Sequence, residues 1–351
     1  MIIKILWTSR DWAAAVAQMP VQGSLPCRTV LVPRGRVAHV LRRKLIRAGR
    51  SDALAGTRFV LAPAAAVEVL RAADLFFKPG EDALRTARLS ALFRSDLRLI
   101  HFSLDLLRST PGWDEAFAHS ISDLEGAALR PEDLEAAGTS EQLRDVAAIW
   151  RALDQSARRS WTIQRVYVEA AAALERRPEA WPFQGPVLAF AAGGLAAAEA
   201  RFLRAIPQGT IGVLAARPGC KRYLDRMEKL LGAEAGAALR SVEAPRAAGS
   251  ERDLLASYLF EPPAVLAGQE RPRSQGPDGS VDLEEHAGVE DELEATAGWV
   301  ARQVADGAPL EEIAVLVPDL DPLAGLVAGV SAGCRGTTVS SRCVWLAGCR
   351  S

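Results

Sequence analysis

The sequence predicts an α/β protein with a parallel sheet, an all-helical insertion and the start of a second α/β domain. Strand and helix patterns alternate three times in the first 80 residues, which is the rhythm of a parallel sheet with helices on its faces. From about residue 79 to residue 177 the pattern becomes purely helical, and strand patterns resume near residue 187. A stretch rich in proline, glycine, arginine and serine over 249–279 precedes a new strand and helix pattern.

The first 80 residues contain three strand patterns, at 2–6, 29–32 and 57–61, each followed by a helical pattern. The turn after the first strand reads Thr8-Ser9-Arg10-Asp11. It has neither the glycines nor the lysine with which a phosphate-binding loop surrounds and neutralises its ligand. We therefore expect the framework of a nucleotide-binding unit without its chemistry.

The helix predicted after the second strand is basic. Pro33 and Gly35 close the strand, and apolar residues at three-and-four spacing then form one side of the helix. Fixed cationic charges at the start of a helix suit a phosphate backbone, because the first amides of the helix are also free donors. The candidate DNA-binding residues are Arg34, Arg36, Arg42 and Arg43. The alternative is an ordinary solvated basic face.

The helical part between residues 79 and 177 contains five periodic segments, at 83–107, 113–126, 131–137, 140–157 and 161–174. A helical stretch of this length is more than a loop and should form its own subdomain. We expect Trp113, Trp150 and Trp161 to be core residues rather than stacking platforms for bases, because tryptophans at helical spacing usually are.

The strand pattern returns at 187–190 and again at 210–215. An NTPase usually places a metal-binding acid at the end of such a strand, but residues 189–194 contain no carboxylate. We assign Glu199, in the following helix, to surface charge. The expected domains are 1–78 with 178–246, the insertion 79–177, a linker over 247–280, the start of a second α/β domain over 281–328 and an aberrant tail over 329–351. In the second domain we expect strands near 281–283 and 313–317 and a helix over 289–305.

Composition limits the class of protein. The chain of 351 residues has a net charge of -1, so contact with nucleic acid would have to come from a local patch. No apolar run reaches the length of a membrane span and no secretion signal is apparent, so we expect a cytoplasmic protein without a membrane partner. The five cysteines lack the spacing of a disulfide framework or a zinc site. We expect no cofactor and no metal.

Several short motifs occur in a distinctive order. They are Thr29-Val30-Leu31-Val32-Pro33 with its basic helix, the helical insertion, the strand and helix over 187–203, Glu290-Asp291-Glu292-Leu293-Glu294-Ala295, and Gly307-Ala308-Pro309-Leu310-Glu311-Glu312-Ile313-Ala314-Val315-Leu316. Over residues 1 to about 325 this order resembles the N-terminal, helicase-like part of AddB-type proteins, which belong with the RecB-family exonucleases that carry a PD-(D/E)XK nuclease domain. The last motif is similar to the opening of the second motor domain of superfamily 1 helicases.

The resemblance implies a sheet of the P-loop NTPase (helicase) type and a role in processing broken DNA ends during recombinational repair. The phosphate loop and the strand-end acid are missing, and Val317-Pro318-Asp319 stands where motors often place an arginine. With these groups absent we expect no ATP hydrolysis and name no catalytic residue. The acids and lysine of the nuclease are also missing. Some relatives hold an iron-sulfur cluster, but the spacing of Cys334, Cys343 and Cys349 does not match a ligand set. We expect the tail to reflect a truncated or frame-shifted gene product; the alternative is a genuine short tail.

Two functions remain from the sequence. In the preferred one, the chain is a non-motor, DNA-binding fragment of an end-processing exonuclease. In the alternative, it is a structural scaffold that docks a helicase-nuclease partner subunit without binding DNA itself. An active enzyme ranks third because no complete catalytic set can be named: His39, His101, His119 and His286 fall on different elements.

Overall fold

The computed structural model describes residues 2–6, 9–20, 27–79, 82–137, 140–157, 160–191, 194–207, 209–214, 221–232, 250–258, 263, 267, 277–317, 325 and 346–347. The chain divides into two compact units, one comprising residues 1–249 and 253–273, the other residues 250–252 and 274–351. No helix in the described ranges is long and apolar enough to cross a lipid bilayer.

The first unit is built on one five-stranded parallel sheet. Its strands are β1 (Ile2–Leu6), β2 (Arg28–Val32), β3 (Thr57–Leu61), β6 (Val187–Ala191) and β7 (Gly209–Leu214), in the spatial order β1-β7-β6-β2-β3. The register pairs Ile3 with Ile211, Ala189 with both Ile211 and Leu31, and Val30 with Phe59. The predicted parallel α/β class is therefore confirmed. Strands β6 and β7, which follow the helical insertion in the sequence, lie between β1 and β2. Segments on either side of the insertion therefore form one sheet.

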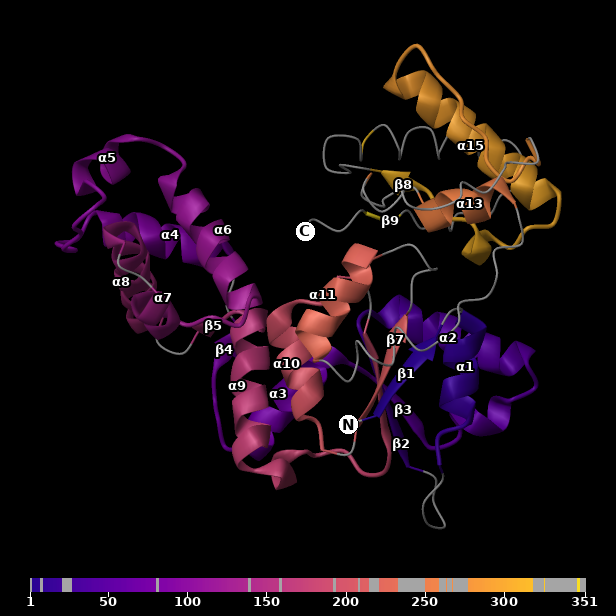
Figure 1. Ribbon diagram of the computed structural model, residues 1–351, viewed down its shortest axis with the longest axis horizontal. Helices are drawn as coiled ribbons and strands as arrows, with labels where there is room; N and C mark the ends of the chain where they lie inside the picture. Colours follow the sequence, from indigo (N-terminus) through magenta and orange to yellow (C-terminus); the bar gives the residue numbers. More distant parts are fainter. Residues whose placement is uncertain are drawn as a thin grey trace. The chain divides into compact units, whose positions relative to one another are not determined.

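Helices cover both faces of the sheet because the connections run in two directions. The chain crosses from β1 to β2 to β3 one way and returns through β6 to β7, and right-handed crossovers place these two sets of helices on opposite faces. One face carries α1 (Ser9–Ala17), α2 (Gly35–Arg47) and the 3-10 turn η1 (Ser51–Leu54). The other carries α3 (Ala62–Ala72), α9 (Ile163–Arg176), α10 (Ala197–Ala205) and α11 (Lys221–Leu231) (Figure 1). We call this sheet and its two helical layers the sheet body.

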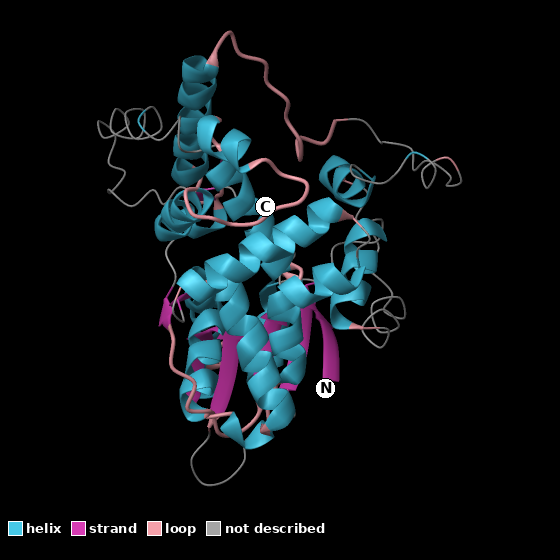
Figure 2. Cartoon of the chain, turned by 90° about the vertical axis from the view of Figure 1, so that its left-hand side faces the viewer, coloured by secondary structure: helices cyan, strands magenta, loops and turns pink. Residues whose placement is uncertain are grey.

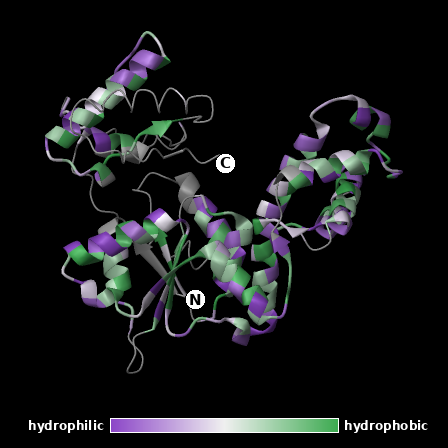
Figure 3. Cartoon of the chain, turned by 180° about the vertical axis from the view of Figure 1, so that it is seen from behind, coloured by the Kyte–Doolittle hydropathy of each residue, from purple (hydrophilic) through white to green (hydrophobic). Residues whose placement is uncertain are grey.

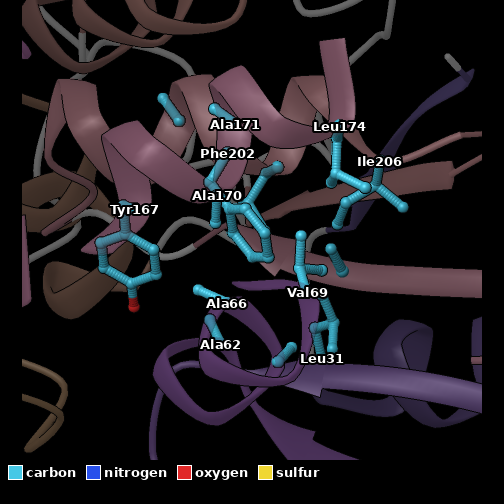
Figure 4. Close-up of a cluster of buried hydrophobic side chains, with 14 of the residues drawn as sticks. Leu31, Ala62, Ala66, Val69, Tyr167, Ala170, Ala171, Leu174, Phe202 and Ile206 are labelled. Carbon is cyan, nitrogen blue, oxygen red and sulfur yellow. The ribbon is translucent and has the colours of Figure 1, made fainter. Parts of the chain in front are cut away.

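The strands in the middle of the sheet are apolar on both sides, as expected between two helical layers. Every residue of β2 and of β6 is buried. In Figure 3 most of the sheet takes the hydrophobic colour, and Figure 2 shows helices packed over the strands. The larger core joins Leu31 to α3, α9 and α10, where Val69, Leu174 and Phe202 meet (Figure 4).

The helices between β3 and β6 form a separate bundle, which we call the helical insertion. It consists of α4 (Asp82–Phe93), α5 (Leu104–Ser109), α6 (Trp113–Gly126), α7 (Pro131–Ala137) and α8 (Glu141–Ser156), around a core of its own. Two short strands, β4 (Lys78–Pro79) and β5 (Ser160–Trp161), pair in parallel where the chain enters and leaves it. Helix α9, which the sequence pattern groups with the insertion, packs against α3 and α10 in the sheet body.

Several details of the predicted elements were wrong. The segment from about 79 to 177 is not purely helical, because β4 and β5 pair at its two ends. The segment 83–107 is not one helix, because α4 ends at Phe93 and α5 begins only at Leu104. No strand forms at 281–283, where Leu283 is 95% exposed. The expected buried strand at 313–317 is reduced to β8 (Leu316–Val317), with Leu316 79% exposed.

The second unit is described only in part. Its long helix α15 (Val289–Ala305) has the predicted bounds and an acidic first turn, which suits the positive end of the helix dipole. The turn η3 (Leu310–Glu312) follows, and β8 pairs in parallel with β9 (Leu346–Ala347). Part of the expected linker forms the helix α13 (Glu251–Tyr258). In the first unit, the turn η2 (Pro178–Ala180) follows α9.

Candidate nucleic-acid interface

Helix α2 packs on the sheet through one narrow apolar face. Ala38, Leu41 and Leu45 are buried against β2, β6 and α1, at the three-and-four spacing of one helix face. The rest of the helix carries Arg36, Arg42, Arg43, Lys44 and Arg47 and no acid. A chain with a net charge of -1 thus concentrates five cations on one helix of thirteen residues.

The N-terminus of α2 starts at the carboxyl end of β2. Arg34 precedes the helix in an extended conformation, and no side chain caps the first amides. These amides point away from the helix at the edge of a parallel sheet, where open α/β folds usually bind ligands. Helix α10 starts in the same way after the neighbouring strand β6, again without a side-chain cap. Residues 192–193, which connect β6 to α10, lie outside the described part.

All four predicted arginines lie on or beside α2, in different environments. Arg34 and Arg42 are exposed, whereas Arg36 and Arg43 are half-buried. In the described part of the chain, Nη1 of Arg36 is buried and has no hydrogen-bond partner. Arg34 and Arg43 each interact with other groups of the protein. The four arginines therefore lie on or beside one helix, but they are not equally exposed.

Arg42 has a support that the sequence analysis did not identify. Its guanidinium carbon lies 4.8 Å from the ring centre of Phe59, on β3. A flat guanidinium over an aromatic face gains cation–π attraction while its N–H groups still point outward. The only sequence signal for this contact was the alternation of β3, which places Phe59 on the same face of the sheet as α2.

The tryptophans serve the protein interior, as expected. Trp150 is 2% exposed in the core of the insertion, and Trp113 packs against Phe102 and Phe117. Trp161 is stacked on Phe77 with a ring-centre distance of 5.2 Å, and the guanidinium carbon of Arg165 lies 5.4 Å from the centre of the Trp161 ring. These rings are already engaged in contacts with protein groups.

Several groups that the sequence was predicted to lack, namely a phosphate-binding loop, a motor arginine and a cysteine ligand set, would fall on residues outside the described part. These are the turn at Trp7 and Thr8, the residues following Val317, and the three C-terminal cysteines. Cys27 is a free, exposed thiol. Within the described ranges, no three His, Cys, Asp or Glu side chains lie close enough to hold a metal ion.

The assignment of Glu199 to the surface was wrong. Glu199 lies in the first turn of α10 and is only partly exposed. Burial raises the pKa of the Tyr167 phenol on α9, and the charge of Glu199 adds to that effect. Burial raises the pKa of Glu199 to about 7, although a helix N-terminus by itself would lower it. Among the described residues no group donates a hydrogen bond to this carboxylate, so its charge is poorly compensated.

Glu199→Gln is expected to stabilise the protein above pH 7. Because the folded pKa lies above the ordinary value of 4.5, the folded state binds more protons between pH 4.5 and about 7, and the carboxylate reduces stability progressively as the pH rises through that window. The glutamine should remove a penalty of about 1–3 kcal/mol at pH 8 and leave stability nearly unchanged at pH 4. Urea unfolding at both pH values measures the difference; equal effects at the two would contradict this account.

No family model matches the chain, and no curated protein is significantly similar to it.

Proposed function

We propose that this chain is the helicase-like, DNA-binding part of an AddB-type exonuclease of the RecB family, acting on broken DNA ends in recombinational repair. In this proposal its sheet is a P-loop NTPase sheet of the helicase type that has lost its motor chemistry. The main support is that strands from residues 2–61 and 187–214 form one parallel sheet with α2 exposed on it. Separate sheets, or a buried α2, would have removed the basis of the proposal.

In this proposal the chain binds DNA through electrostatic contacts. Arg34, Arg36, Arg42 and Arg43 neutralise phosphates, and the uncapped amides at the start of α2 add neutral donors. Contacts of this kind position a duplex or a single strand without reading its sequence. They also release counterions, so affinity must fall steeply with salt.

Replacing these four arginines by glutamine is expected to weaken DNA binding and to flatten its salt dependence. If each residue contacts one phosphate, the slope of log K against log salt concentration should become shallower by about four units. Fluorescence anisotropy with labelled duplex and single-stranded DNA of unrelated sequences measures both quantities. The loss should be similar for all sequences, since the contacts carry no base readout.

A matched variant controls for net charge. Arg98, Arg144, Arg176 and Arg177 are exposed and lie away from α2, so their joint replacement by glutamine removes the same charge. The proposal fails if binding survives the loss of the α2 arginines, or if the control variant loses as much affinity.

The scaffold alternative has one structural observation in its favour. The insertion exposes large apolar side chains on or beside α4 and α5: Leu84 is 47%, Ile100 is 64% and Leu106 is 50% exposed. Large apolar side chains that are exposed to solvent often mark sites of contact with other proteins. Stable association with a helicase-nuclease subunit by a protein that shows no affinity for DNA would favour the scaffold over DNA binding.

A further inference from the structure

The helical insertion and the sheet body have separate hydrophobic cores. Phe117, Ile121 and Trp150 belong to the core of the insertion, whereas Tyr167, Val168 and Leu174 of α9 belong to the core of the sheet body. Each part can therefore keep its own packing if the contact between them changes.

The junction between the two cores is only partly filled. An open cavity of about 160 Å³ lies there, with Trp150 and Leu129 on the side of the insertion and Val168 on the side of α9. Its other lining residues are mostly charged, among them Glu132, Arg151 and Glu169. A polar cavity of this size accommodates several water molecules. Part of the junction is thus an open, mostly charged space, although Ala128 at the end of α6 packs against the core of the sheet body.

Charged groups bridge the junction. Arg165 of α9 donates from Nη1 to Oδ2 of Asp154 in α8 at 2.6 Å. Arg130, just before α7, lies 3.6 Å from Glu169 of α9. Thr162, the N-cap residue of α9, donates from Oγ1 to Glu125 of α6 at 2.8 Å.

The strength of these bridges depends on their geometry. Burial raises the pKa of Glu125 and of Asp154, and the neighbouring arginines, Arg85 and Arg165 respectively, only partly offset that effect. Charges removed from water are stabilising only while their partners remain in place. Small displacements of the insertion therefore change the energy of the junction steeply.

The covalent connections are also placed side by side. β4 and β5, which flank the insertion, pair through only two residues each, Lys78 with Ser160 and Pro79 with Trp161. Two chain crossings at one place permit rotation about that place, as in other hinged domains.

We propose that this junction is a hinge: the helical insertion swings on the sheet body about β4 and β5, and the ion pair between Asp154 and Arg165, supported by Arg130–Glu169 and Thr162–Glu125, holds it closed. Opening exchanges these bridges for contacts with water, and both cores stay intact. The hinge does not involve the arginines of α2.

Distance measurements by pulsed electron paramagnetic resonance test the hinge in the full chain. Spin labels on non-natural amino acids at Ala64 of α3 and Ala91 of α4, both exposed, leave the native cysteines untouched. At low salt we expect one narrow distance distribution. At about 1 M salt, where the Debye length falls to about 3 Å, the distribution should broaden and gain a second distance. Asp154→Asn should do the same at low salt.

Two further variants separate the ion pair from general effects. Glu175→Gln removes the ion pair with Arg201, which lies entirely within the sheet body at 2.9 Å, and should leave the distribution narrow. The exchange Asp154→Arg with Arg165→Asp should recover much of the narrow distribution. Unchanged distances in high salt and in Asp154→Asn would overturn the hinge, and so would equal broadening in Glu175→Gln or a charge exchange that stays as broad as Asp154→Asn. The salt titration needs no substitution, so a variant that misfolds does not remove the test.

Discussion

Asp145→Ala is expected to destabilise the helical insertion by about 3–5 kcal/mol, because it removes the charged acceptor of hydrogen bonds from three backbone amides, all of them partly buried. Asp145 lies on α8 and is 2% exposed. Its carboxylate accepts hydrogen bonds from the amides of Ile100, His101 and Phe102, at distances between 2.7 and 3.0 Å. These bonds hold the segment between α4 and α5 against α8.

The local effect can be measured by hydrogen–deuterium exchange. Peptides that cover residues 99–103 should exchange much faster in Asp145→Ala, and urea unfolding followed by circular dichroism gives the loss of stability. Asp105→Ala is the matched control, because Asp105 on α5 is 94% exposed in its side chain and, among the described residues, forms an ion pair with Arg108 alone, at 3.5 Å. Such a surface pair contributes about 0–1 kcal/mol. Protection of residues 100–102 that persists without the Asp145 carboxylate would contradict its role.

Asp145 also illustrates where sequence-based prediction reaches its limit. The helix of α8 was predictable because Ile149, Trp150 and Leu153 repeat at helical spacing. A charged residue four positions before Ile149, on the same apolar side, was a visible sign of a buried carboxylate. Its donors, however, lie 43 to 45 residues away, and no local pattern identifies them. The same bonds explain why the helix predicted over 83–107 is interrupted. In the segment between α4 and α5, backbone amides donate to Asp145 instead of to helical carbonyls.

The sheet shows the same division between local and non-local information. Each strand was predictable from its own apolar run, and the parallel arrangement from the alternation with helices. The order, with β7 and β6 between β1 and β2, depends on contacts between residues that are up to about two hundred positions apart, such as Ile3 and Ile211. The basic surface of α2 was predictable because it belongs to one helix, whereas the support of Arg42 by Phe59 and the burial of Glu199 each require a second element.

Gly185→Ala is expected to cost at least about 4 kcal/mol, since it combines a backbone clash with an unfavourable conformation. Gly185 has a φ of +77° and directly precedes the residue whose carbonyl, Pro186 O, accepts from the amide of Thr29 at 3.0 Å. A Cβ at this position would lie 2.0 Å from the carbonyl oxygen of Cys27. The strands β2 and β6 would have to separate at the point where the early and late parts of the sheet join.

Gly49→Ala isolates the conformational part of this cost. Gly49 has a similar φ of +68°, but a Cβ there meets nothing within 4 Å, so the loss should be about 1–2 kcal/mol. Urea unfolding compares the two variants, and hydrogen exchange of β2 and β6 locates the damage. Adding Cys27→Ala to Gly185→Ala should restore nothing, because the obstructing atom is a backbone oxygen and not the thiol. Recovery of stability in that double variant would show that the Cys27 side chain causes the clash. The requirement for glycine at position 185 would then not come from the close approach of the two backbones.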